Sequence, residues 1–253
     1  VLAPCSPFSV TPRLMWETVQ LARAKGVRLH THLAETADED SYCLRKYGKR
    51  PLELMEDADF LGPDVSYAHG IFFTDQELAL LAKTGTGVCH CPSSNMRLGS
   101  GIARVKEMLA LGIPVSIAVD GSASNDTSDY LGEMRQALLL QRIKYGSDAI
   151  TASEVYSLAT EGGAKTLGFN KIGRIEPGYA ADLAIFNVDK LEYAGSRSDP
   201  LASLLFCGIS HNSAYTIVNG KVAVRDGHLT GIDELEILKE ANKCASRHSS
   251  YIY

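Results

Sequence analysis

Residues 28–40 read RLHTHLAETADED, a short alternating stretch that runs into an acidic segment. Side chains of an extended chain alternate between two faces, so His30 and His32 are expected to share one face while Leu29 lies on the other. Glu35 follows His32 by three residues. The stretch therefore predicts either a catalytic corner that carries a metal or a polar strand end that leads into a helix.

The order of strand, loop and helix recurs along the chain. A first helix is predicted at residues 12–25, with Thr11 as N-cap, Pro12 at the first helical position and Gly26 after the end. Strands are predicted at 27–33, 64–70, 86–92 and 113–121, and further helices at 74–85, 101–112, 127–146 and 151–168. This alternation indicates a parallel α/β sheet, either a (β/α) barrel or a doubly wound sheet. In both folds the chemistry lies at the carboxyl ends of the strands.

The chain is predicted to divide into three parts. Residues 1–168 hold the alternating strands and helices. Residues 169–230 are rich in β-branched residues and glycine, and Asn219-Gly220 marks a two-residue hairpin turn, so a small β module is expected there. Residues 231–253 return to helical spacing.

Composition limits the kinds of partner. The 253 residues are 45% hydrophobic with a net charge of −5, and no block of lysine and arginine forms a basic stripe, so nucleic acid is not expected as a partner. The longest apolar runs are shorter than the roughly 20 residues that cross a bilayer, so no membrane partner is expected either. Six scattered cysteines without a CxxC pair favour reduced thiols and a cytoplasmic location.

Three strand ends deliver residues suited to metal or proton chemistry: His32 with Glu35, His69 and Asp120. Each is weak alone, because a histidine at a strand end is more often structural and an Asp-Gly pair is more often a turn. Together they favour one shared site, since parallel strands end at the same edge. Imidazole and carboxylate suit Zn²⁺ or Fe²⁺, which lowers the pKa of bound water to about 7, and a nearby glutamate can carry protons.

Other catalytic motifs do not occur in the sequence, including the P-loop, the G-x-S-x-G elbow, H-E-x-x-H and the paired motifs of zinc cytidine deaminases. The tract Cys89-His90-Cys91 looks like a metal tract. In a strand, however, the two thiols face away from the imidazole, so buried thiols are the better interpretation. The following CPSSN is predicted to be a loop that lines a pocket.

The segments HTHLAET, YAHGIFF, CPSSNMRLGSG, VDGSASND and GRIEPGYAADLAIFNVD followed by IVNGKV resemble the amidohydrolase superfamily. The branch is the one that holds guanine, 8-oxoguanine and S-adenosylhomocysteine deaminases and the triazine hydrolases, and PCSPFSVTPRLM is similar to its 8-oxoguanine deaminase-like and hydroxyatrazine hydrolase-like members. The resemblance runs in order over nearly the whole chain. It implies the C-terminal portion of a (β/α)8 TIM-like barrel, from strand 4 or 5 to strand 8, plus a small β-sandwich module.

The resemblance also implies roles for individual residues. His32 and Asp120 would be metal ligands, to zinc or alternatively to iron. Glu35 would protonate a ring nitrogen of the substrate, His69 would polarise the substrate or the attacking water, and Asp120 would also accept the proton of the water. The substrate pocket would be lined by SSNMRLGSG, with Ser94 and Asn95 as polar contacts.

The sequence departs from the family in one respect. The family carries an H-x-H at the end of barrel strand 1 that supplies two more ligands, and His30-x-His32 belongs instead to the strand 5 motif. We therefore expect residues 1–253 to be part of a longer or cleaved polypeptide.

Three functions remain open at this stage. The first is a metal-dependent aminohydrolase that removes an amino group from an aromatic N-heterocycle, with 8-oxoguanine or a related purine as substrate, in a homo-oligomer. The second is displacement of an alkylamino group or a halide from a triazine. The third is a noncatalytic fragment that packs against a partner chain.

Overall fold

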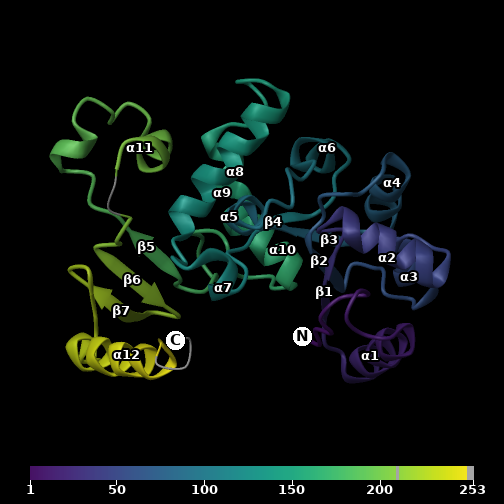
Figure 1. The fold of residues 1–253 in the computed structure, drawn as a ribbon. Coiled ribbons are helices and arrows are strands. Elements are labelled where there is room, and N and C mark those ends of the chain that lie inside the picture. Colours follow the sequence, from purple (N-terminus) through teal and green to yellow (C-terminus); the bar gives the residue numbers. More distant parts are fainter. Residues whose placement is uncertain (209–210, 250–253) are drawn as a thin grey trace.

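The computed structural model describes residues 1–208 and 211–249. Its centre is a four-stranded parallel sheet in the order β1-β2-β3-β4 (Figure 1). The strands are β1 (Leu29–Leu33), β2 (Val65–His69), β3 (Gly87–His90) and β4 (Val115–Ile117). Each neighbouring pair is parallel, which confirms the predicted α/β alternation.

Helices connect the strands and cover one face of the sheet. They are α1 (Pro12–Lys25), α2 (Ala37–Tyr47), α3 (Pro51–Asp57), α4 (Asp75–Thr84), α5 (Pro92–Arg97), α6 (Val105–Ala110), α7 (Ser122–Asn125), α8 (Tyr130–Tyr145), α9 (Ala152–Ser157), η1 (Leu158–Gly162) and α10 (Gly163–Leu167). The predicted ends of α1 are confirmed: the Thr11 hydroxyl accepts a bond from the amide of Leu14, and Gly26 adopts a left-handed conformation.

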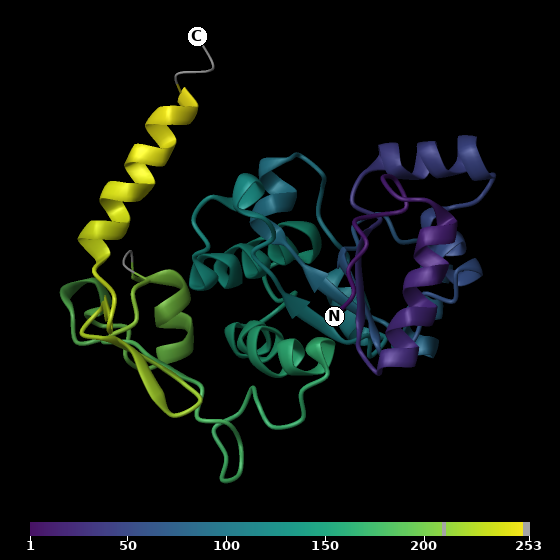
Figure 2. The same ribbon diagram turned by 90° about the horizontal axis from the view of Figure 1, so that it is seen from below.

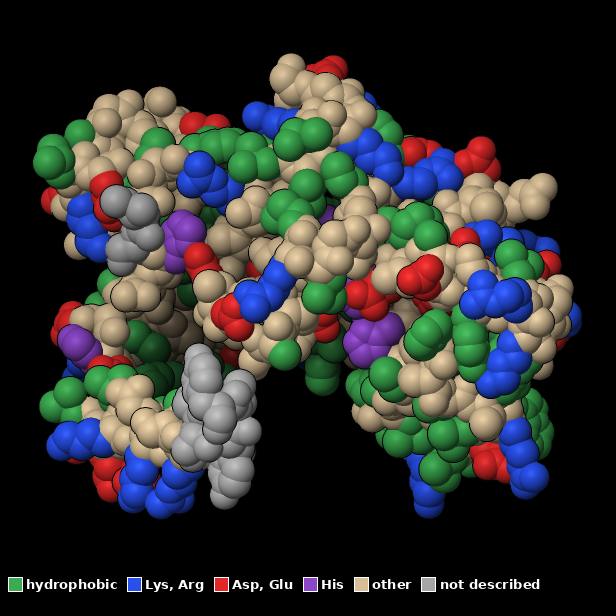
Figure 3. Space-filling view, viewed as in Figure 1, with side chains coloured by type: hydrophobic (Ala, Val, Ile, Leu, Met, Phe, Trp, Pro, Cys, Tyr) green, Lys and Arg blue, Asp and Glu red, His purple; other side chains and the backbone are tan. Residues whose placement is uncertain are grey.

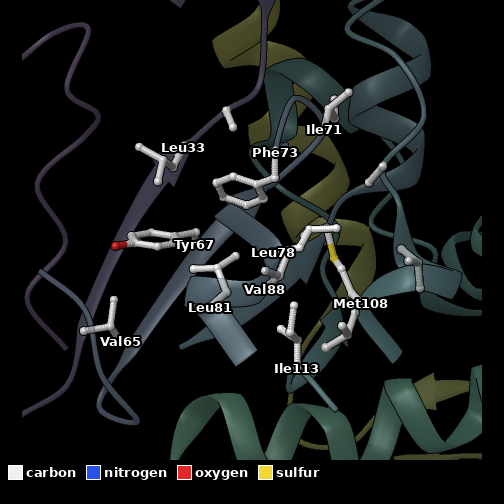
Figure 4. Close-up of a cluster of buried hydrophobic side chains, with 14 of the residues drawn as sticks. Leu33, Val65, Tyr67, Ile71, Phe73, Leu78, Leu81, Val88, Met108 and Ile113 are labelled. Atoms are coloured by element: carbon white, nitrogen blue, oxygen red, sulfur yellow. The ribbon is translucent and has the colours of Figure 1, made fainter. Parts of the chain in front are cut away.

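The core lies between the sheet and these helices. Figure 4 shows Tyr67 and Val88 from the strands packed against Leu81 and Met108 from the helices. All four side chains are fully buried, and each buried side chain of this size contributes about 1.5–3 kcal/mol. The alternation of β1 is confirmed as well, because Leu29 and its same-face neighbours are buried in this core while the two histidines are half-buried on the opposite face.

Three predicted segments differ from the structure. The strand predicted at 113–121 ends at Ile117, so Asp120 lies in the loop after β4. The CPSSN segment is not a loop, since Pro92 begins the short helix α5. The helix predicted at 151–168 is interrupted by one π-helical turn, η1.

Residues after α10 build the second part. Strands β5 (Leu183–Ile185), β6 (Tyr215–Val218), β7 (Lys221–Arg225) and β8 (His228–Leu229) form one antiparallel sheet. Val218 pairs with Lys221 around Asn219-Gly220, which confirms the predicted hairpin. The expected sandwich would need a second sheet, and none occurs within 1–208 and 211–249 beyond the two already named.

Two helical segments and one terminal helix complete this part: η2 (Leu191–Tyr193), α11 (Pro200–Phe206) and α12 (Glu234–Ser249). Helix α11 packs against α8 and α9. Helix α12 projects away from the parallel sheet (Figure 2). It confirms helical structure for most of the predicted segment 231–253, whose last four residues lie outside the described ones.

The surface carries mixed charges. On the face shown in Figure 3, lysine and arginine occur in small groups separated by acidic and apolar side chains. In the described part of the chain, no helix combines the length and apolar character needed to cross a bilayer.

Candidate metal centre and active site

His32 reaches the carboxyl edge of the sheet from β1. Its Nδ1 lies 2.7 Å from the carbonyl oxygen of Cys5, and the same oxygen accepts bonds from the His32 amide and the Thr31 hydroxyl. Because a carbonyl can only accept, Nδ1 carries the hydrogen and Nε2 keeps its lone pair. The imidazole is therefore held with a free acceptor nitrogen facing the site, as metal-binding histidines are.

His69 is buried at the end of β2. Its backbone φ is +73°, a left-handed value that is uncommon for any residue other than glycine. The Nδ1 of His69 lies 2.8 Å from Oδ1 of Asn95, and its ring is 5.5 Å from the ring of His32 at an angle of 25°. An amide oxygen accepts, so Nε2 of His69 also keeps its lone pair.

Asp120 is likewise left-handed, with a φ of +63°. Its Oδ2 accepts bonds from the hydroxyls of Ser94, at 2.5 Å, and Ser124, at 2.9 Å. Burial raises the pKa of Asp120, but these hydrogen bonds outweigh it and hold the pKa below its usual value. Its Oδ1 faces His32, with a distance of 4.0 Å to Nε2.

The three side chains form one cluster. One ligand atom from each of His32, His69 and Asp120 lies within 4.8 Å of the other two. Glu35 adds a carboxylate, with Oε2 3.6 Å from Nε2 of His69. The free imidazole nitrogen of His32 and the oriented carboxylate of Asp120 are donors that fit Zn²⁺, which binds histidine and aspartate at about 2.0–2.2 Å, and Nε2 of His69 lies in the same cluster. The structure thus brings together every residue predicted for metal or proton chemistry.

The two predicted substrate contacts take other partners here. Ser94 and Asn95 are fully buried in α5, where Ser94 bonds Asp120 and Asn95 bonds His69. A role in touching substrate stays a prediction for both. Sequence reasoning did not find Ser124 or the Cys5 carbonyl. Ser124 follows Asp120 within a short polar run, which is a weak signal, and a backbone carbonyl leaves no signal in the sequence.

The cysteine tract is buried only in part, since Cys91 is buried as predicted while Cys89 is half-buried. Burial raises the pKa of both the Cys89 and Cys91 thiols, so they are poor ligands at neutral pH. His90 is fully buried, and burial lowers its pKa to about 3. Its imidazole is therefore neutral at physiological pH.

Comparison with known proteins identifies the family of the chain. The sequence profile of the amidohydrolase family matches residues 1–223. The chain belongs to the amidohydrolase family. The family inferred from the sequence motifs is thereby confirmed.

Several amidohydrolases are similar over nearly the whole chain. 8-Oxoguanine deaminase from Pseudomonas aeruginosa is 46% identical over 245 residues, which cover 97% of this chain and 54% of that protein. Isoxanthopterin deaminase from an unknown prokaryotic organism is 39% identical over 259 residues, which cover 96% of this chain and 54% of that protein. The chain therefore spans about half the length of these curated relatives.

A solved amidohydrolase structure extends the comparison. Atrazine chlorohydrolase TrzN from Arthrobacter aurescens TC1, complexed with zinc, superposes with a TM-score of 0.92 at 30% identity. The match covers 96% of this chain and 54% of that one, so the structure corresponds to about half of an amidohydrolase.

Proposed function

We propose that the protein is a zinc-dependent aminohydrolase that deaminates an aromatic N-heterocycle, with 8-oxoguanine or a related aminopurine as substrate. The observation that carries this proposal is the convergence of His32, His69 and Asp120 within 4.8 Å, with Glu35 alongside. Two relatives support the proposal, namely 8-oxoguanine deaminase at 46% identity and isoxanthopterin deaminase at 39% identity. Both are named for removing an amino group.

In the proposed site, His32 and Asp120 hold the metal. The Cys5 carbonyl fixes the ring of His32, while Ser94 and Ser124 fix one carboxylate oxygen of Asp120 and leave the other directed at His32. Zinc bound there would act as a Lewis acid and lower the pKa of a water molecule to about 7.

The proton transfers fall to the protein side chains. Water adds to the ring carbon that bears the amino group, and Asp120 accepts the proton that the water loses. Glu35 protonates the adjacent ring nitrogen, a role supported by its position near Nε2 of His69. Asp120 then passes its proton to the amino nitrogen, the carbon–nitrogen bond breaks and ammonia leaves, and the hydroxyl proton returns to Glu35 as the hydroxyl becomes an oxo group.

His69 assists the reaction through Nε2, the ring nitrogen that does not bond Asn95. Because Nδ1 donates to the Asn95 oxygen, Nε2 is the atom that faces the site, where its lone pair accepts a hydrogen bond from the attacking water and so polarises it. The side chain is almost completely buried, so this contact operates with little screening by solvent.

The likeness to atrazine chlorohydrolase supports an alternative, the displacement of a halide or an alkylamino group from a triazine. A panel of substrates separates the two. The whole protein, supplied with zinc, is assayed for ammonia release from 8-oxoguanine, guanine and isoxanthopterin, and for product from chlorotriazines and alkylamino-hydroxytriazines. The proposal requires the highest kcat/KM on an aminopurine. A higher value on a triazine would replace it by the alternative, and failure to bind zinc would favour a noncatalytic module.

A further inference from the structure

Glu39 is a buried acid next to the proposed site that the mechanism above does not use. It is the third residue of α2, only 5% exposed, and its Oε2 accepts a hydrogen bond of 3.0 Å from the backbone amide of Glu35. Its Oε1 is buried and has no hydrogen-bond partner in the part of the chain that the structure describes. Burying a carboxyl group with one oxygen unbonded costs free energy, so stability alone gives no reason for this residue.

The bond from Glu39 acts on the turn that carries Glu35. Ala34, at the start of this turn, has a φ of +55°, a left-handed conformation that is strained in a residue with a side chain. The carbonyl oxygen of Ala34 accepts bonds from the amides of Ile71, at 2.8 Å, and Phe72, at 3.0 Å. The peptide group between Ala34 and Glu35 is thus bonded at both ends. The loop after β2 donates to its carbonyl oxygen, and Glu39 accepts from its amide.

The same two segments are joined again through Arg50. Its guanidinium donates to Oδ2 of Asp40, at 2.9 Å, and to the carbonyl oxygen of Phe72, at 2.9 Å. Asp40 is the neighbour of Glu39 in α2, so the first turn of α2 is tied to the loop that follows His69. The turn at Glu35 is therefore held between two segments that cannot move independently.

We propose that Glu39 is a positioning residue for the acid/base group Glu35: by binding the Glu35 amide it fixes the turn that holds the Glu35 carboxylate beside His69. The inference rests on the proposed function, because it concerns the residue that moves the proton there. Loss of this bond lets the turn shift without removing Glu35 itself. Displacements of about 1 Å at a catalytic group cost up to about 100-fold in rate.

The test compares Glu39→Ala with Glu39→Gln in the whole zinc-loaded protein. The glutamine keeps an oxygen that can accept from the Glu35 amide, whereas alanine does not. We expect kcat to fall about 10- to 100-fold in Glu39→Ala with KM and zinc content unchanged, and to recover to within about threefold of the parent value in Glu39→Gln. Equal losses in both variants, or an unchanged kcat in Glu39→Ala, would overturn the proposal.

A matched control is Glu154→Ala. Glu154 is also the third residue of a helix, α9, and caps it through Thr151, but it is exposed, and within residues 1–208 and 211–249 its side chain bonds Thr151 alone. This variant removes a glutamate at the same helix position, together with its bond to a backbone amide, and should leave kcat unchanged. A fall in kcat equal to that of Glu39→Ala would assign the effect to general loss of stability and overturn the proposal.

Hydrogen exchange gives a readout that does not depend on activity. The amide of Glu35 should exchange at least tenfold faster in Glu39→Ala and near the parent rate in Glu39→Gln. If the parent protein deaminates no heterocycle, the proposed function fails while this comparison still decides whether Glu39 holds the turn. Should Glu39→Ala not fold, Glu39→Asp serves instead, since its shorter side chain withdraws the oxygen. Exchange and kcat at parent values in that variant would contradict the proposal.

Discussion

The Nε2 atom of His32 lies 4.0 Å from Oδ1 of Asp120, although the two residues come from opposite edges of the parallel sheet. Neighbouring strands are about 4.8 Å apart, so β1 and β4 would be separated by roughly 14 Å in a flat sheet. The sheet must curl, as a segment of a barrel does, and the loop after β4 must turn Asp120 inward (Figure 1). The site is therefore a consequence of curvature and of the loops at the strand ends.

Removal of His32 should remove the metal. We expect His32→Ala to lower zinc affinity by more than about 100-fold, because loss of even an outer partner of a metal ligand costs 10- to 100-fold. Zinc content after dialysis, measured by mass spectrometry, checks this. His30→Ala is the matched control, since His30 lies on the same face of β1 but bonds Ser66. Similar zinc loss in both variants would contradict the assignment.

Removal of the proposed acid/base group, Glu35, should stop turnover without loss of metal. Glu35→Gln keeps the size of the side chain but cannot take up a proton, so kcat should fall by about 100- to 10,000-fold. Zinc content should stay at the parent value. Near-normal kcat in this variant would show that another group transfers the proton.

Substitution of Asn95 distinguishes two interpretations of its role. If it orients His69 through the bond to Nδ1, Asn95→Ala should lower kcat about tenfold with little change in KM, and Asn95→Asp, which keeps an acceptor oxygen, should lose less. If Asn95 contacts the substrate, as the sequence predicted, KM should rise instead. Steady-state kinetics on the preferred substrate distinguishes the two results.

Glu39 should make stability depend on pH. Burial raises its pKa from 4.5 to about 7, so its carboxyl favours the folded state in the protonated form. The contribution of protonated Glu39 to the free energy of unfolding is fully present below about pH 4.5 and is lost as pH rises through 7. The free energy of unfolding of Glu39→Gln, relative to that of the parent, should therefore be higher at pH 8 than at pH 5. The increase should be on the order of 3 kcal/mol. Denaturant unfolding at the two pH values measures it, and a pH-independent difference would contradict the raised pKa.

The regular elements were predictable from local patterns. The sequence pattern indicates directly the features that depend on local backbone geometry. These are the alternation around His30 and His32 and the helix caps at Thr11 and Gly26. The hairpin at Asn219-Gly220 follows for the same reason.

The fine geometry of the site was not predictable in this way. His69 and Asp120 adopt left-handed conformations that are uncommon outside glycine, and the surrounding tertiary contacts hold them there. The partners of Asn95 and Glu39 likewise depend on how the strand-end loops meet. Such contacts join residues far apart in sequence or take a backbone group as partner, so no periodicity indicates them.

The most direct test is a crystal structure of the whole zinc-loaded protein with anomalous diffraction data recorded at the zinc absorption edge. The proposal predicts an anomalous peak about 2.0–2.2 Å from both Nε2 of His32 and a carboxylate oxygen of Asp120. A zinc ion bound elsewhere, with His32 and Asp120 free of it, would contradict the assignment of the metal centre and with it the proposed deamination.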